Sequence, residues 1–142
     1  DSLGTALDQL LLPARVEVFP GRLSSCLDAA HTPESMQSLR LALEEIDFPQ
    51  PRALIFSLSS DKRRKEVLEE ASAIADEIIF TRADETRSVC PEELRDTLGY
   101  GRVIEDPAEA LACAWRKELN PVITGSFYLA GALRPQLRKK SA

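Results

Sequence analysis

The sequence predicts an α/β fold: a three-layer sandwich in which a mostly parallel sheet of about five or six strands carries helices on both faces. Short apolar runs alternate along the chain with segments whose apolar residues recur at helical spacing. This alternation is typical of βαβ units with right-handed crossovers. The runs at 53–58 and 77–81 are almost continuously apolar, as expected for strands that are covered on both sides.

Each element follows from a local signal. The expected strands lie at 26–27, 53–58, 77–81, 102–105 and 121–124, and residues 16–19 alternate weakly between apolar and polar. The expected helices lie at 1–12, from Pro33 to Ile46, at 67–75, from Pro91 to Leu98, from Asp106 to Leu119 and from Phe127 onward. Thr32 and Asp106 are good helix N-caps, and each is followed by a proline, which suits the first helical position. Gly99 provides a helix end.

Apolar side chains at helical spacing are expected to face the core. They are Met36, Leu39, Leu43 and Ile46 in one helix, Ala108, Leu111, Ala112, Trp115 and Leu119 in the next-to-last helix, and Phe127, Leu129, Ala130 and Leu133 in the last helix.

Composition bounds the function. The chain has 142 residues, of which 44% are hydrophobic and 29% charged, which suits one globular domain. A net charge of −5 argues against a nucleic-acid-binding face, because phosphate contacts need clustered Lys and Arg. No apolar run could span a membrane. The three widely spaced cysteines indicate neither a zinc site nor a disulfide framework, so we expect a reducing, cytoplasmic setting.

Polar residues follow three of the expected strands. Asp28 and His31 come after the first main strand, 57–62 after the second, and 124–126 after the last. Carboxyl ends of parallel strands share one edge of the sheet, and ligands bind at that edge in open α/β sheets. His31, the single histidine, is suited to orient or deprotonate an amine near neutral pH. A single histidine with no second ligand indicates no metal site.

Structural interpretations of the same residues stay open. Asp28 and His31 are also compatible with a capped helix that has a solvated carboxylate and a surface histidine. Asp61 is also a helix cap, and Lys62 also belongs to a solvated basic helix start. Residues 124–126 also suit a tight helix entry.

Arg22 lies on a Pro-Gly turn, where it would grip a phosphate, stack on a base, or remain an exposed rim arginine. The sequence contains neither a Gly-x-x-x-x-Gly-Lys-Ser/Thr nor a Gly-x-Gly-x-x-Gly pattern. The chain is therefore expected to have no phosphate-cradling loop of its own.

The ordered set of motifs resembles the C-terminal domain of the Mur ligase superfamily, in its folylpolyglutamate synthase/dihydrofolate synthase branch. The motifs are Phe19-Pro20-Gly21-Arg22, Leu27-Asp28-Ala29-Ala30-His31-Thr32-Pro33-Glu34-Ser35, Asp61-Lys62, Asp106-Pro107 with Ala110-Leu111, and Thr124-Gly125-Ser126-Phe127-Tyr128-Leu129. Their order and spacing agree over nearly the whole chain.

This resemblance implies a Rossmann-like domain of an ATP-dependent ligase that joins L-glutamate to a folate. In this family the N-terminal domain holds the P-loop, the magnesium ligands and the folate, and it forms an acyl phosphate. By position, Arg22 and Asp28 would contact ATP, and His31 and Ser126 would bind or orient glutamate. The C-terminal domain alone would then have no ligase activity.

The resemblance also divides the chain. Residues 1–22 would be a linker and a short helix from the upstream domain, and 23–142 the Mur ligase-like domain. Asp61 and Lys62 would match a motif near the nucleotide.

Three departures from the family pattern stand out. Ala29 replaces a usual glycine, Thr32 replaces a frequent asparagine, and the segment from Arg22 to Asp28 is short, which leaves the position of Arg22 open. The alternatives are a domain of a peptidoglycan-precursor Mur ligase and a stand-alone Rossmann-like binding or regulatory module.

Overall fold

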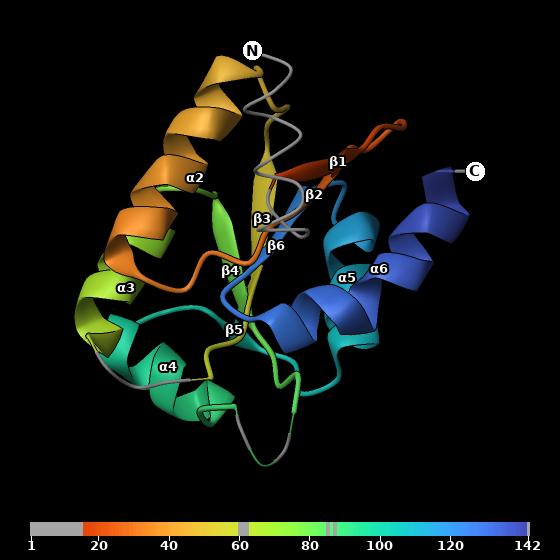
Figure 1. Cartoon of the computed structure of the whole chain (residues 1–142). Coiled ribbons are helices and arrows are strands. Elements are labelled where there is room, and N and C mark those ends of the chain that lie inside the picture. The colour runs from red at the N-terminus through yellow and green to blue at the C-terminus, as the bar shows by residue number, and fades with distance from the viewer. Residues whose placement is uncertain (1–15, 60–62, 85, 87, 142) are drawn as a thin grey trace.

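A six-stranded sheet forms the centre of the computed structural model, which describes residues 16–59, 63–84, 86 and 88–141 (Figure 1). The strands are β1 (Glu17–Phe19), β2 (Ser25–Leu27), β3 (Arg52–Phe56), β4 (Glu77–Phe80), β5 (Arg102–Val103) and β6 (Asn120–Thr124). Their order is β1-β2-β6-β3-β4-β5, and all neighbours are parallel except β1 and β2. The predicted α/β class and mostly parallel sheet are confirmed.

Helices cover both faces of the sheet, as Figure 1 shows. One face carries α2 (Pro33–Glu45), α3 (Arg64–Ser72) and α4 (Pro91–Leu98), and the other carries α5 (Pro107–Arg116) and α6 (Phe127–Ser141). Strand side chains alternate between two cores. Leu54 and Phe56 pack under α2 and α3, whereas Ala53 and Ile55 pack under α5 and α6. None of the helices in the described residues is long and apolar enough to cross a membrane.

The central strands are buried along their whole length. Every residue of β2, β3 and β6 is buried, as expected for strands that lie between two helical layers. Cys26 belongs to this core, and burial raises the pKa of its thiol. It therefore stays neutral and packs as a small apolar side chain.

Two apolar residues predicted for the core are exposed instead. Ile46 continues the stripe of Met36, Leu39 and Leu43, but α2 ends at Glu45 and Ile46 is the C-cap residue, so its side chain is 49% exposed. Phe127 is 51% exposed because it lies off the stripe that the four-residue spacing of Leu129, Leu133 and Leu137 sets on α6.

The buried face of α5 also differs from the prediction. Leu111 and Leu119 are buried as expected, but Ala108, Ala112 and Trp115 are only half-buried. The helix instead buries Ala110, Leu111, Cys113 and Ala114. The small alanines allow the helix to approach the sheet closely, which leaves the large indole at its edge.

A short antiparallel hairpin begins the described chain. In it, β1 pairs with β2 through Glu17 opposite Leu27 and Phe19 opposite Ser25. This strand lies in the segment 1–22 that the sequence analysis assigned to a linker, and it forms the edge of the sheet. The helix predicted at 1–12 lies outside the described residues.

Candidate functional site

Three neighbouring strands end side by side at the carboxyl edge of the sheet. β2, β6 and β3 are adjacent and parallel, so the residues that follow them converge. The backbone N–H of Asp28 donates to Ile123 O at 2.9 Å, and that of Ser57 donates to Thr124 O at 3.4 Å. The structure thus brings together Asp28, His31 and Ser126, as predicted.

Asp28 holds the turn that follows β2. Its side chain is buried, with 4% exposed, and each carboxylate oxygen accepts a backbone hydrogen bond. Oδ1 accepts from Val16 N at 2.7 Å, and Oδ2 accepts from Ala30 N at 2.8 Å. A charged acceptor makes such bonds strong, so this carboxylate fixes the path of the chain toward His31.

His31 stands at the end of this turn, exposed to solvent. Its Nδ1 lies 2.9 Å from Ala29 O, and its backbone N–H donates to Ser35 Oγ at 3.1 Å. Thr32 caps α2, since Ser35 N donates to Thr32 Oγ1 at 3.1 Å and Thr32 N donates to Ser35 Oγ at 2.9 Å. The predicted N-cap is therefore confirmed, and this reciprocal cap seats the histidine at the start of the helix.

The turn after β6 requires a glycine. Gly125 has a φ of +104°, and a Cβ added there would lie 2.0 Å from Ser57 O. The following Ser126 is buried, and its Oγ accepts from Tyr128 N at 3.0 Å and lies 3.3 Å from Ser59 Oγ. Thr124 Oγ1 donates to Ala30 O at 3.1 Å, which ties this turn to the turn that carries His31.

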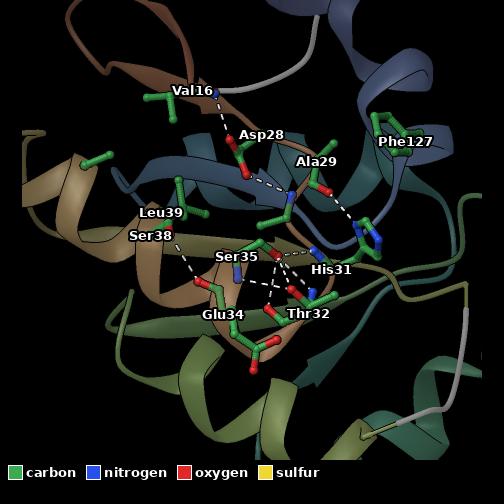
Figure 2. A pocket seen from close by; sticks show the side chains of 12 residues that line it. Val16, Asp28, Ala29, His31, Thr32, Glu34, Ser35, Ser38, Leu39 and Phe127 are labelled. Carbon is green, nitrogen blue, oxygen red and sulfur yellow. Dashed lines mark hydrogen bonds between the residues drawn. The ribbon is translucent and has the colours of Figure 1, made fainter. Parts of the chain in front are cut away.

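Two hollows meet at His31 and Phe127. The large hollow, of about 350 Å³, lies between the turn 28–32, α2 as far as Ala42, Val16 and Phe127 (Figure 2). The small hollow, of about 180 Å³, is lined by His31, Leu58, Ser59, Gly125, Ser126, Phe127 and Tyr128. The sequence analysis missed Phe127 as a wall of the site because it counted this residue among the core. Its position off the leucine stripe of α6 was the signal that could have revealed it.

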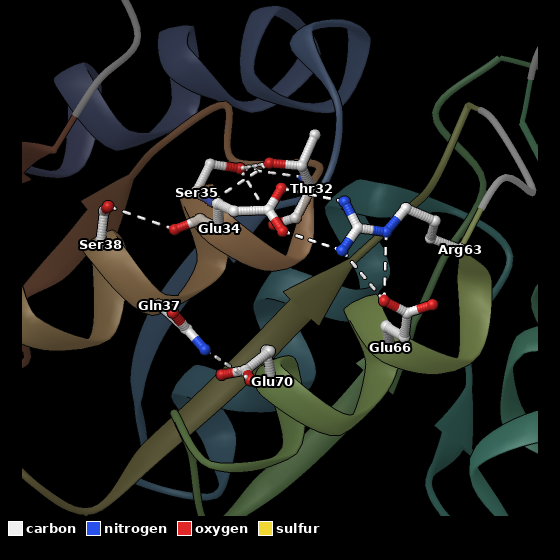
Figure 3. Close-up of polar contacts among 8 residues, drawn as sticks. All are labelled: Thr32, Glu34, Ser35, Gln37, Ser38, Arg63, Glu66 and Glu70. Atoms are coloured by element: carbon white, nitrogen blue, oxygen red, sulfur yellow. Dashed lines mark hydrogen bonds and ion pairs between the residues drawn. The ribbon is translucent and has the colours of Figure 1, made fainter.

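An ion-pair cluster lies at the same edge, between α2 and α3 (Figure 3). Arg63 donates to both carboxylate oxygens of Glu34 at 3.0 and 2.9 Å and to Glu66 at 3.1 and 3.0 Å. The hydrogen bond from Arg63 lowers the pKa of Glu34, and hydrogen bonds to Glu34 and Glu66 raise the pKa of Arg63. The cluster keeps Arg63 engaged beside the site.

Arg22 lies at the opposite, amino edge of the sheet. It forms an ion pair with Glu118 at 2.5 Å and lines a separate hollow of about 260 Å³ with Trp115 and Lys140. Ser24 N donates to the side chain of Asn120, where β6 begins, which fixes the hairpin at this edge. The structure therefore does not bring Arg22 to Asp28, and the ATP contacts predicted for these two residues stay predictions. Asp61 and Lys62 lie outside the described residues.

The described residues contain no group of His, Cys, Asp or Glu side chains that could hold a metal ion. The side chains at the carboxyl edge fit an amine and a carboxylate better. His31 offers a ring nitrogen, and the α6 N-terminus favours negative charge. This edge therefore offers a hydrogen-bonding ring nitrogen close to a helix N-terminus.

Comparisons with known proteins agree with this fold. Residues 14–127 match the family described as Mur ligase, glutamate ligase domain. The chain is 31% identical over 127 residues to folylpolyglutamate synthase of Lacticaseibacillus casei, a match that covers 88% of the chain and 29% of that relative. The chain thus spans less than a third of the length of this curated relative.

Solved structures give the same result. Folylpolyglutamate synthase of Thermotoga maritima superposes with a TM-score of 0.75 at 29% identity, over 89% of this chain and 31% of that one. E. coli FolC, in complex with DHPP and ADP, shares the fold with a TM-score of 0.79 at 20% identity, over 92% of this chain and 32% of that one. The chain belongs to the family of Mur ligase glutamate ligase domains.

Proposed function

We propose that this chain is the C-terminal domain of an ATP-dependent folylpolyglutamate synthase, and that residues 23–142 bind and orient L-glutamate. The observation that most directly supports this proposal is the small hollow, which His31 and Ser126 both line at the N-terminus of α6. The matched relatives include folylpolyglutamate synthases, which supports glutamate as the amino acid and a folate as the acceptor. The free cysteines are compatible with the cytoplasm.

His31 would accept a hydrogen bond from the glutamate amine. A carbonyl oxygen can only accept, so the contact of Nδ1 with Ala29 O requires the proton on Nδ1. Nε2 of the neutral ring then carries a lone pair. This atom can hold the amine and take its proton when the amine attacks.

Ser126 would shape the pocket for the glutamate carboxylates. Its Oγ accepts from the backbone N–H groups of Tyr128 and Leu129 in the first turn of α6, which fixes the helix N-terminus beside His31. The positive end of the helix dipole would favour a carboxylate there. Amine and carboxylate would thus be held at neighbouring points of one wall.

The acceptor would be presented by an upstream P-loop domain, where ATP with magnesium converts the folate carboxyl group to an acyl phosphate. Water competes with an amine for such a group. Assembly of the pocket from two domains on closure would therefore suppress hydrolysis. Correct placement of two reactants supplies roughly 7–11 kcal/mol of barrier reduction, which is the contribution expected of this domain.

The test uses the intact ligase that carries this domain, with glutamate-dependent ATP turnover measured on folate substrates. We expect His31→Ala to raise the KM for glutamate about tenfold or more and to leave the KM for ATP unchanged, because a lost hydrogen bond to a charged group is worth about 1.5–3 kcal/mol. Arg22→Gln is the control at the other edge of the sheet, and it should leave the KM for glutamate unchanged. An unaltered glutamate dependence in His31→Ala would refute the proposal.

A further inference from the structure

Phe127 is an exposed aromatic side chain beside the only histidine of the chain. Its ring is half exposed although the other apolar residues early in α6, Leu129 and Ala130, are buried. Its centroid lies 6.1 Å from that of His31, with the planes tilted by 52°. Figure 2 shows the two rings side by side at one end of the large hollow. This distance and tilt fall within the range of favourable aromatic pairs.

The two rings form the partition between the hollows. His31 and Phe127 line both the large hollow and the small hollow. A rotation of the imidazole about its χ angles would therefore change which hollow its nitrogens face. Exposed side chains exchange rotamers readily, so a fixed orientation needs contacts that hold the ring.

Two such contacts come from different elements. Ala29, in the turn after β2, provides the acceptor for Nδ1 at 2.9 Å. Phe127, at the first turn of α6, provides the aromatic ring contact. The hydrogen bond fixes one edge of the imidazole, and the aromatic contact restricts rotation about that bond.

We infer that Phe127 is a positioning residue for His31, which it holds in one tautomer and one orientation so that Nε2 stays available to an amine. The availability of Nε2 to an amine rests on the proposed function, whereas the positioning of the ring does not. In the described residues Nε2 has no hydrogen-bond partner. Nε2 is thus the open ring nitrogen of a side chain that Ala29 O and the Phe127 ring otherwise hold.

The first experiment needs no substrate and uses the 142-residue chain. Because His31 is the single histidine, two-bond ¹H–¹⁵N correlations of the imidazole report its tautomer without ambiguity. We expect the proton on Nδ1 in the unaltered chain and in Phe127→Tyr, and a mixture of tautomers in Phe127→Leu, which keeps apolar bulk without a ring. Since Phe127 is half exposed, these variants should fold.

Other spectra would overturn the inference. A tautomer mixture in the unaltered chain would show that His31 is not held. Identical tautomers in Phe127→Leu and the unaltered chain would show that the ring does not hold it. Loss of the Nδ1 proton in Phe127→Tyr as well as in Phe127→Leu would exclude the aromatic contact as the cause.

The second experiment separates this inference from the proposed function. In the intact ligase, Phe127→Leu should raise the KM for glutamate about two- to tenfold, the range that an aromatic pair contributes. The KM for ATP should stay constant, and Phe127→Tyr should restore the KM for glutamate. A shifted tautomer with an unchanged KM for glutamate would refute the role of His31 in glutamate binding while the positioning by Phe127 stands.

Discussion

The two edges of the sheet use charged and polar residues in different ways. At the amino edge, cationic side chains find acceptors: Arg22 pairs with Glu118, Lys117 pairs with Glu77, and buried Arg52 donates to Phe48 O at 2.6 Å. At the carboxyl edge, Asp28 and Ser126 accept hydrogen bonds from backbone N–H groups of turns. These cations connect separate elements, whereas Asp28 and Ser126 fix the path of loops. Each edge also has one example of the other kind: Asn120 accepts from Ser24 N at the amino edge, and Arg63 joins α2 to α3 at the carboxyl edge.

This difference separates structural polar groups from the walls of a site. Arg22 has the residue type and the turn that would suit a phosphate and lines a separate hollow, and its guanidinium pairs with Glu118. His31 keeps a ring nitrogen without a partner among the described residues, and two hollows open beside it. We therefore recognise a candidate site by buried polar groups that hydrogen-bond the backbone next to a side chain whose polar atom is available to a ligand.

The largest expected loss of stability comes from a substitution in the turn after β6, at the carboxyl edge. We expect Gly125→Ala to lower the free energy of unfolding by about 3–5 kcal/mol, because the φ of +104° disfavours a side chain and the new Cβ would overlap Ser57 O. Urea unfolding of the 142-residue chain measures this. Gly131→Ala is the matched control, since a Cβ at this exposed helical position meets no atom within 4 Å. It should stabilise the chain by about 0.5–1 kcal/mol. Equal effects of the two substitutions would contradict the described turn.

The second test compares the two edges directly. Asp28→Ala leaves the backbone N–H groups of Val16 and Ala30 without this acceptor, so we expect a loss of about 2–3 kcal/mol. Arg22→Gln removes an ion pair whose side chains are 73% and 61% exposed, and it should cost about 0.5 kcal/mol or less. Urea unfolding at neutral pH and moderate salt measures both. A larger loss of unfolding free energy for Arg22→Gln than for Asp28→Ala would contradict the conclusion that the buried acceptor at the carboxyl edge matters more to stability than the exposed ion pair at the amino edge.

Local signals in the sequence predicted most of the carboxyl edge. Thr32 followed by Pro33 marked the start of α2, and Thr124 to Ser126 marked a tight helix entry, because capping and φ preferences depend on neighbouring residues. The convergence of Asp28, His31 and Ser126 followed from parallel strands alone. Long-range contacts were not predictable in this way. The partner of Arg22 is 96 residues away, and Glu34, one of the two partners of Arg63, is 29 residues away.

Ile46 and Phe127, which were predicted to face the core but are exposed, show the limit of hydrophobic periodicity as a predictor of burial. Ile46 kept the spacing of the α2 stripe, but the helix stopped one residue earlier. Phe127 was counted with the apolar residues of α6, although it lies off the four-residue spacing of Leu129, Leu133 and Leu137. Its position on the rim depends on where β6 delivers α6.

The smallest expected effect concerns the ion-pair cluster beside the site. The hydrogen bond from Arg63 lowers the pKa of Glu34 in the folded chain, so folding stability gains from the ionised carboxylate above the unfolded pKa of about 4.5 and loses this gain as pH falls through the folded pKa. The difference in urea midpoint between the unaltered chain and Glu34→Gln should therefore be greatest near neutral pH and vanish in acid. The same comparison in an Arg63→Gln background should depend much less on pH, because the donor that stabilises the carboxylate is gone. A pH dependence that persists unchanged in that background would show that Glu34 responds to the α2 dipole rather than to Arg63.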